Sequence, residues 1–429
     1  MKALVLGSGG REQAIAWKIA KSPLVSEVII APGNAGSFPK TRNTDLDIND
    51  ADAVADFLTK ESVELLVVGP EQPLVGGLVD ELLTRPELSG LHIVGPTREA
   101  AQMEGSKDFA KAFMQRHGIP TAKYRSFTSD EREAALDYLR NEERAPYVLK
   151  ADGLAAGKGV LICQTLEEAE EGLDSMLGGK FGHSADTILI ETCLTGIECS
   201  VFVLTDGKSY RILPTAKDYK RIGEGDTGLN TGGMGAVSPV PFIDDEFMTK
   251  VKERIIEPTI RGLAEDEIDY RGFLYFGLMN QDGDPYVIEY NCRMGDPETQ
   301  AVMPRIAGDL VPSLLALRDQ SLADTENPGE IEETALTVVA AMKGYPESYA
   351  KGAQVIIYGD DSDSSIVFHS GTTGGGQDIR SCGGRVFAVT ALDRGIMRAR
   401  KRAYERMMMT CFDDMYYRHD IGKDLVEYE

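Results

Sequence analysis

The sequence predicts a multidomain protein of mixed α/β and α+β class. Its 429 residues exceed the size at which one hydrophobic core keeps growing, so two to four domains are expected. Strand-like and helix-like segments alternate over the first hundred residues, which predicts a parallel sheet with crossover helices. The remainder combines strands, glycine-rich loops and one long helical segment, which is typical of α+β domains.

The N-terminal domain, residues 1–103, is predicted to be a Rossmann-like parallel sheet. A buried strand over Lys2–Leu6 leads into a glycine-rich turn and then into an amphipathic helix over Arg11–Ser22. Further strands are predicted at Val28–Ile30, Leu65–Gly69 and His92–Gly95, and helices at Asp52–Lys60 and Pro73–Thr84.

The central domain, residues 104–325, is predicted to carry a lid subdomain at about residues 121–192. A helix over Ser106–His117 ends before Gly118 and Pro120. The lid is expected to contain strands at Tyr147–Ala151, Val160–Cys163 and Thr187–Glu191 and a helix at Leu166–Met176. Beyond it the sequence predicts strands at Cys199–Thr205, Phe273–Asn280 and Tyr286–Asn291 and a long helix at Asp244–Asp266.

The last domain, residues 326–429, is predicted to be small and β-rich. It follows a segment of linker composition, Asp324–Pro328. Strands are expected at Thr334–Ala341, Gln354–Ile357, Ile366–His369 and Arg385–Leu392, followed by a helix at Asp393–Met409.

Composition and charge argue against several classes of protein. The formal net charge of −24 argues against a general binder of nucleic acid or of membrane surfaces. Six scattered cysteines without a CxxC pair indicate neither a zinc cage nor a disulfide framework. The N-terminus shows no signal-peptide order, and no apolar run reaches membrane-spanning length, so we expect a cytoplasmic protein.

The motif GSGGREQA, residues 7–14, predicts an anion site. A turn between a strand and a helix presents free backbone N–H groups at the positive end of the helix dipole. Gly9, Gly10, Arg11 and Glu12 are therefore candidates for binding a phosphate group. Because Glu12 stands where the dinucleotide fingerprint needs glycine, an NAD oxidoreductase is disfavoured. A purely structural turn is the alternative.

The motif KADGLAAGKGV, residues 150–160, fails the Walker pattern because only three residues separate Gly153 from Gly157. A glycine-rich loop between two strands can still fold over a triphosphate, with Lys150 and Lys158 supplying charge. A flexible solvent-exposed hairpin is the alternative.

Two further segments carry weaker signals. In ETCLTGIECS, residues 191–200, backbone groups near Glu191 and Leu194 could pair with an adenine edge, and Glu198 could accept from ribose hydroxyls; a solvated turn is the alternative. The run TAKDYKR…DTGLNTGGMGA, residues 215–236, joins Lys217, Asp218, Lys220 and Arg221 to a glycine-rich loop. Such loops are usually functional, with an ordinary Ω-loop as the alternative.

The motif VIEYNCRMGDPETQ, residues 287–300, predicts a metal site. Glu289 and Asn291 lie two apart on a strand, so both point to one face. Hard oxygen ligands of this kind suit Mg²⁺, which completes its shell with water and phosphate oxygens. Arg293 adds a third side chain, and a solvated strand face is the alternative.

Together these motifs resemble the phosphoribosylamine–glycine ligase family of ATP-grasp enzymes over essentially the whole chain. The resemblance also rests on PGNAGS at 32–37, VGPEQPL at 68–74, EGSK at 104–107, FHSGT at 368–372 and GGRVFAVTAL at 383–392. It departs from the family pattern at three positions: Gln13 replaces a common His, Thr192 a second Glu, and Met294 a Phe.

The resemblance implies specific roles. For ATP, the phosphates would contact Lys107, Lys150 and the lid loop Gly153–Gly159, which includes Gly157, Lys158 and Gly159; adenine would contact Glu191 and Leu194, and ribose Glu198. Glu289 and Asn291 would bind Mg²⁺ (or Mn²⁺), and Arg293 and Asp218 would lie at the acyl-transfer centre. The substrate would contact Gly9–Glu12, Lys220, Gly232 and Gly233.

The implied reaction joins glycine to 5-phosphoribosylamine at the expense of ATP, through glycyl phosphate, in purine synthesis. No nucleic acid or membrane partner is expected, and the chain would act as a monomer or homodimer. Two alternatives stay open: a related ligase that takes bicarbonate or formate, and an inactive nucleotide-binding protein.

Overall fold

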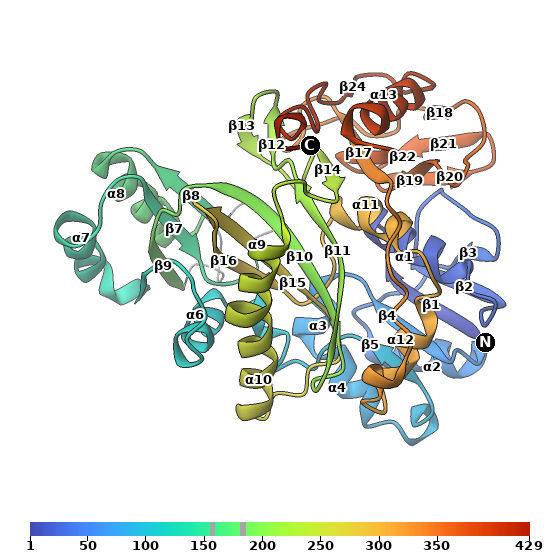
Figure 1. The fold of residues 1–429 in the computed structure, drawn as a ribbon, viewed down its shortest axis with the longest axis horizontal. Helices are drawn as coiled ribbons and strands as arrows, with labels where there is room; N and C mark the ends of the chain where they lie inside the picture. Colours follow the sequence, from blue (N-terminus) through green and yellow to red (C-terminus); the bar gives the residue numbers. More distant parts are fainter. Residues whose placement is uncertain (155–158, 181–185) are drawn as a thin grey trace.

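The computed structural model describes residues 1–154, 159–180 and 186–429. Figure 1 shows the lid to the left of strands β10 (Ile197–Thr205), β11 (Tyr210–Asp218) and β15 (Gly272–Gln281) and the N-terminal domain and the C-terminal region to their right. The predicted class, α/β followed by α+β, is confirmed. Among the helices of these residues, none is long and apolar enough to cross a membrane.

The N-terminal domain is a five-stranded, wholly parallel sheet in the order β3-β2-β1-β4-β5. Its elements are β1 Lys2–Gly7, α1 Gly10–Ala20, β2 Glu27–Pro32, β3 Thr41–Asn43, α2 Ala51–Glu61, β4 Leu65–Val68, α3 Glu71–Gly76, α4 Leu78–Leu83, η1 Pro86–Leu88 and β5 His92–Val94. The prediction of a single helix at Pro73–Thr84 is wrong, because the segment forms two helices, α3 and α4. Gly77 has a φ of +89°, a left-handed conformation that ends α3 and starts α4.

The lid has its own sheet and its own core. Its four strands pair antiparallel in the order β6-β9-β7-β8, and two helices cover them. Their bounds are β6 Tyr124–Thr128, η2 Ser129–Glu131, α7 Arg132–Asn141, β7 Tyr147–Ala151, β8 Val160–Cys163, α8 Leu166–Ser175, η3 Met176–Lys180 and β9 Thr187–Thr192. Leu136, Leu149, Leu173 and Ile190 belong to the buried cluster between sheet and helices. Strand β6 and helix α7 were not predicted.

The central sheet runs without a break from the second region into the third. Its order is β16-β15-β10-β11-β14-β17-β22-β19, with β24 paired to β17. These strands are β10 Ile197–Thr205, β11 Tyr210–Asp218, β14 Gly235–Ser238, β15 Gly272–Gln281, β16 Asp284–Asn291, β17 Thr334–Met342, β19 Ser365–His369, β22 Arg385–Asp393 and β24 Met415–Tyr416. The pairing of β14 with β17 joins the strands of both regions into one sheet.

The remaining elements surround this sheet. They are α5 Gln102–Gly105, α6 Lys107–Arg116, β12 Arg221–Gly223, β13 Thr227–Asn230, α9 Asp245–Val251, η5 Lys252–Ile256, α10 Glu257–Glu265, α11 Glu298–Arg305, α12 Val311–Ala316, η6 Leu322–Asp324, β18 Ile356–Ile357, β20 Thr372–Gly375, β21 Asp378–Ser381, α13 Ile396–Met407, β23 Thr410–Cys411 and η7 Val426–Tyr428. The long helix predicted at Asp244–Asp266 contains a π-helical turn, η5, just before Pro258, which has no N–H to donate.

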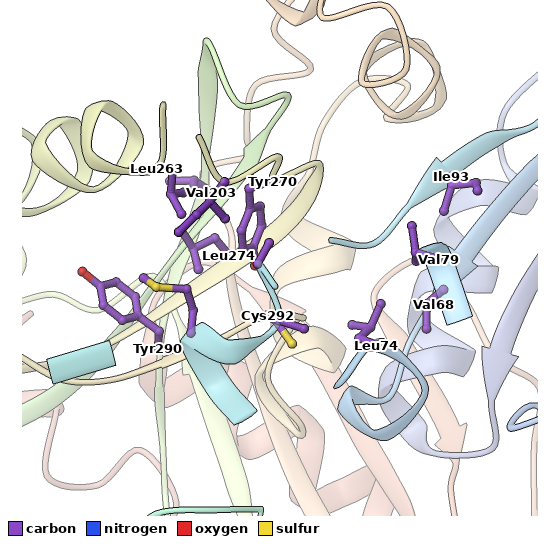
Figure 2. Close-up of a cluster of buried hydrophobic side chains, with 14 of the residues drawn as sticks. Val68, Leu74, Val79, Ile93, Val203, Leu263, Tyr270, Leu274, Tyr290 and Cys292 are labelled. Carbon is purple, nitrogen blue, oxygen red and sulfur yellow. The ribbon is translucent and has the colours of Figure 1, made fainter. Parts of the chain in front are cut away.

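A shared core fixes the N-terminal domain against the central sheet. Figure 2 shows Val68 and Ile93 of the parallel sheet in the same buried cluster as Leu274 and Tyr290 of β15 and β16. All four side chains are at most 9% exposed. Because burial of this apolar surface stabilises one arrangement, the N-terminal domain is rigidly placed beside the ends of the central strands.

Candidate active site

Lys107 lies where the lid joins the central domain. It is the first residue of α6, which Ser106 caps through its side chain. Its Nζ donates to the carbonyl oxygens of Ala151, Asp152 and Gly153 at 2.8, 3.2 and 3.2 Å. Burial lowers the pKa of Lys107. The ammonium group therefore holds the start of the glycine-rich loop.

Lys150 on β7 belongs to a buried cluster of three charges. Its Nζ lies 2.9 Å from Glu191 Oε2, and Lys111 Nζ lies 3.1 Å from the same oxygen. Burial would raise the pKa of Glu191, but the two lysines outweigh it and hold the pKa below its usual value. Burial lowers the pKa of Lys111 to about 8.

Lys111 was missed by the sequence reasoning. It stands four residues after Lys107, on the same face of α6, and this helical spacing was the signal that could have found it. Glu191 Oε2 is committed to the two lysines, and Glu191 pairs with Tyr124 and Val148 within the lid sheet. The resemblance also assigns Glu191 a contact with adenine. That contact stays a prediction.

Glu289 and Asn291 lie at the end of β16, opposite Gly277 and Tyr275 of β15. They are two apart in a regular part of the strand and share one face. A Cβ at Gly277 would approach Glu289 Cγ to 3.2 Å, so the glycine leaves room for that side chain. Within residues 1–154, 159–180 and 186–429, no three His, Cys, Asp or Glu side chains gather closely enough to hold a metal ion by themselves.

Arg293 follows β16 and is held by two carboxylates from the N-terminal side. Its Nη2 donates to Glu104 Oε1 at 2.6 Å, and its Nε donates to Glu71 Oε2 at 3.3 Å. Glu104 also accepts from the backbone N–H of Cys292 at 2.8 Å. Burial would lower the pKa of Arg293, but the carboxylates more than offset it, so the guanidinium stays charged. Glu71 and Glu104 were missed, although both lie in quoted motifs, VGPEQPL and EGSK.

A second charged cluster surrounds Asp218 at the end of β11. Lys220 Nζ lies 2.5 Å from Glu198 Oε2. The Ser200 hydroxyl donates to Glu298 Oε1 at 3.3 Å. Burial and the negative charge of Asp218 raise the pKa of Glu298 to about 8, and burial raises the pKa of Asp218 as well. Glu198 is thus paired with Lys220, and its predicted contact with ribose stays a prediction.

A cavity of about 460 Å³ opens beside the N-terminal loop. Gly9, Arg11 and Glu12 line it together with Asp296, Ser370 and Arg385 from the other two regions. The backbone N–H of Gly9 already donates to Glu12 Oε2 at 2.8 Å. The cations of this lining are Arg11, paired with Glu12 at 2.5 Å, and Arg385, 3.3 Å from Asp296.

Arg385 also connects the cavity to the second glycine-rich loop. Its Nη1 donates to the Gly232 carbonyl at 2.5 Å and to the Asp296 carbonyl at 2.9 Å. The structure therefore brings Gly9–Glu12, Gly232 and Gly233 to one place, whereas Lys220 lies in the cluster with Glu198. Ser370 and Arg385 belong to the quoted motifs FHSGT and GGRVFAVTAL but had been given no role.

The remaining predicted residues belong to the lid. Gly153 and Gly159 flank the glycine-rich loop, and the Gly159 carbonyl accepts from Ala151 N at 2.8 Å. Gly157 and Lys158 lie outside the described residues. Leu194 is half-buried in the connection between β9 and β10.

The chain is similar to known proteins along its whole length. Family models for the phosphoribosylglycinamide synthetase N domain, ATP-grasp (A) domain and C domain match residues 1–104, 105–299 and 335–424. The phosphoribosylamine–glycine ligase of Escherichia coli strain K12 is 47% identical over 437 residues, covering 100% of both chains. The enzyme of that name from Vibrio parahaemolyticus is 46% identical, covering 98% of each.

Solved structures give the same result. The crystal structure of the phosphoribosylamine–glycine ligase of Thermotoga maritima superposes with a TM-score of 0.82 at 33% identity, covering 98% of this chain and 100% of that one. The biotin carboxylase domain of Hydrogenobacter thermophilus 2-oxoglutarate carboxylase shares the fold, with a TM-score of 0.70 at 15% identity over 99% of this chain and 92% of that one. Agreement in sequence, domain order and fold shows that the chain belongs to the phosphoribosylamine–glycine ligase family.

Proposed function

We propose that this chain ligates glycine to 5-phosphoribosylamine with ATP, giving glycinamide ribonucleotide, ADP and phosphate. The observation that carries the proposal is the 47% identity, over the full length of both chains, to a relative whose name states this reaction. The clusters around Lys150, Asp218 and Arg293 support it, because they gather cations and carboxylates from the lid, the central sheet and the N-terminal side. The chain would act in the cytoplasm.

ATP would lie between the lid and the central sheet. Lys107 and Lys150 would contact its phosphates, and the loop from Gly153 to Gly159, with Gly157 and Lys158, would cover them. Lys150 Nζ lies 3.4 Å from the Ile288 carbonyl, next to the proposed metal ligand Glu289, which brings the lid lysine to the catalytic strand. Closure of the lid would keep water from a reactive intermediate.

Glu289 and Asn291 fit Mg²⁺, or Mn²⁺ in its place. One carboxylate and one amide oxygen on one strand face leave the rest of an octahedral shell to water and phosphate oxygens, which is the usual pattern for Mg²⁺ with nucleotides. The small residue at 277 keeps Glu289 free of steric crowding. The bound ion would neutralise phosphate charge.

The acyl step requires an activated carboxylate, because oxide is a poor leaving group. A glycine carboxylate oxygen would attack the γ-phosphorus of ATP, and ADP would leave. The amine of phosphoribosylamine would then attack the glycyl carbonyl carbon, and phosphate would leave. Arg293, fixed by Glu104 and Glu71, would stabilise the negative charge that develops in both steps. Asp218 would position the amine substrate.

The phosphoribosyl group would occupy the cavity beside the N-terminal loop. Arg11 and Arg385 would meet its phosphate, and Asp296 would accept hydrogen bonds from ribose hydroxyls. Gly9, Gly10, Glu12, Gly232 and Gly233 would shape the cavity wall. Lys220, paired with Glu198, would meet the substrates beside Asp218.

The first test is phosphate release with Mg²⁺ and ATP, with phosphoribosylamine generated in place from ribose 5-phosphate and ammonia. Glycine, bicarbonate and formate are offered separately. The proposal expects release that needs glycine and disappears in Glu289→Ala, whereas Glu257→Ala, an exposed acid on α10, changes nothing. Release with bicarbonate or formate instead would overturn the assigned substrate.

The glycyl phosphate intermediate has its own test. Glycine labelled with ¹⁸O in its carboxylate should deliver one labelled oxygen to each inorganic phosphate, because the attacking oxygen leaves with the phosphoryl group. Unlabelled phosphate would exclude the intermediate.

A further inference from the structure

The loop that carries Lys220 is closed at its base and held at its tip. Residues 219–235 leave β11, form the hairpin β12–β13 and return to β14. At the base, the N–H and the hydroxyl of Thr231 both donate to the carbonyl of Lys220, at 2.8 and 2.9 Å. The tip is the turn around Gly225 and Asp226, between β12 and β13.

Arg418 is the anchor that holds this tip. Its side chain is only 1% exposed. Nη1 donates to the Arg221 carbonyl at 3.0 Å and to Asp226 Oδ1 at 2.7 Å. Nε and Nη2 grip Asp420 at 2.8 and 2.7 Å. A planar guanidinium with donors in fixed directions sets position as well as distance, which an ammonium group cannot do.

Neighbours of Arg418 fasten the same hairpin along its length. We call residues 416–424 the C-terminal strap. Tyr416 OH donates to the Ile222 carbonyl at 2.7 Å, and the N–H of Gly225 donates to Asp420 Oδ2 at 2.8 Å. Near the hairpin base, Asp424 accepts from Tyr219 OH at 2.5 Å. The strap therefore contacts the hairpin at tip, middle and base.

The strap also reaches the strand that ends in Asp218. Asp424 Oδ2 lies 3.2 Å from Lys217 Nζ, one residue before Asp218. Lys220, two residues after Asp218, meets Glu198 at 2.5 Å. The hairpin tip itself is poorly held by packing, since the Asp226 side chain is 55% exposed and its φ is +53°. Its position accordingly depends on polar contacts with the strap: those of Arg418, that of Asp420 with Gly225, and those of His419 with Glu224.

We propose that Arg418 is a positioning residue for the ligase reaction, which fixes the β12–β13 hairpin through Asp226 so that Lys220 and Asp218 meet the substrates correctly. The inference rests on the proposed function, because that function assigns Lys220 and Asp218 to the substrate site. Arg418 itself touches no proposed substrate position. Loss of the anchor should therefore impair use of glycine and phosphoribosylamine more than ATP binding, to which Lys220 is linked only through Glu198.

The test uses Asp226→Asn, Arg418→Lys and the double variant in the full chain. Asn tolerates the left-handed conformation of position 226, so the first variant removes charge without new backbone strain. Hydrogen exchange of the amides in residues 219–231 should accelerate about ten-fold or more in each variant. The kcat/KM for glycine should fall about ten-fold, with KM for ATP within two-fold, and the double variant should be no worse than Arg418→Lys.

Arg406→Lys is the matched control. Arg406 is also a buried arginine of the last domain, 6% exposed, but it holds Asp361 and the Gly359 carbonyl, away from the hairpin. It should lose comparable thermal stability without faster hairpin exchange or altered use of glycine. An equal kinetic loss in Arg406→Lys, or unchanged hairpin exchange in both strap variants, would overturn the proposal. Hydrogen exchange can be measured without turnover. If the wild-type chain did not catalyse the proposed reaction, the exchange result would still show whether Arg418 holds the hairpin.

Discussion

Replacing Glu191 by glutamine is the sharpest test of the charge cluster beneath the lid. Glu191 is 3% exposed, and its Oε2 meets Lys150 and Lys111 at 2.9 and 3.1 Å. The amide cannot neutralise either ammonium group. Breaking a buried ion pair by removing one partner costs about 3–5 kcal/mol, because the remaining charge stays desolvated.

This loss of free energy should make local opening of the lid easier. The lid has its own hydrophobic core, and a multidomain chain does not unfold as one unit, so local protection is the right observable. Hydrogen exchange of the amides of β7 and β9 should lose roughly two to almost four powers of ten in protection at pH 7, since about 1.4 kcal/mol corresponds to a factor of ten.

Two further conditions make the expectation specific. The pKa of Lys111 is lowered to about 8, so at pH 9 this lysine sheds its proton and the penalty of Glu191→Gln should be smaller than at pH 7. The same substitution on a Lys111→Met background should also cost less, because one ammonium is gone. A loss of protection below ten-fold at pH 7, or an equal cost in both backgrounds, would refute the reasoning.

Three other perturbations follow from the site. Glu104→Gln removes the negative charge that Arg293 Nη2 meets at 2.6 Å. In the phosphate-release assay, kcat should fall about ten- to hundred-fold while KM for ATP stays unchanged. An unaltered kcat would contradict the idea that Glu104 positions Arg293. Arg385→Met should raise KM for phosphoribosylamine about ten-fold, and an equal rise for ATP would instead indicate general damage. Burial lowers the pKa of His369 from 6.5 to about 4, so the unfolded chain binds a proton that the native state does not bind, and local stability falls as pH drops through this window. This loss, about 3 kcal/mol, should appear as reduced hydrogen-exchange protection of the β19 amides, and His369→Gln should abolish it. The same pH dependence of protection in both proteins would contradict this.

Much of the fold could be predicted because its signals are local. The alternation of buried strands and amphipathic helices in residues 1–103 identified four of the five parallel strands, and Ser106 marked the start of α6. Strand β11, Tyr210–Asp218, was missed because Pro214 and several polar residues interrupt its alternation. Its strand state comes from pairing with β10 and β14 on either side.

The domain arrangement depends on similar distant pairings. Linker composition at Asp324–Pro328 suggested a boundary, yet β14 pairs with β17 and one sheet crosses that boundary. No periodicity within either segment contains this information, because sheet pairing across some hundred residues is decided by the competing burial of all strands at once.

The sequence by itself determined which residues carry charge and, for Lys107, Lys150 and Glu289, on which helix or strand each one lies, because backbone periodicity and capping are local properties. Asp218 is the exception, because its strand β11 was missed. Only the tertiary structure decided which charges meet. Arg293 finds Glu104 across 189 residues and Arg418 finds Asp226 across 192. Buried charges are stable only with partners, and those partners are selected by the packing of whole domains rather than by spacing along the chain.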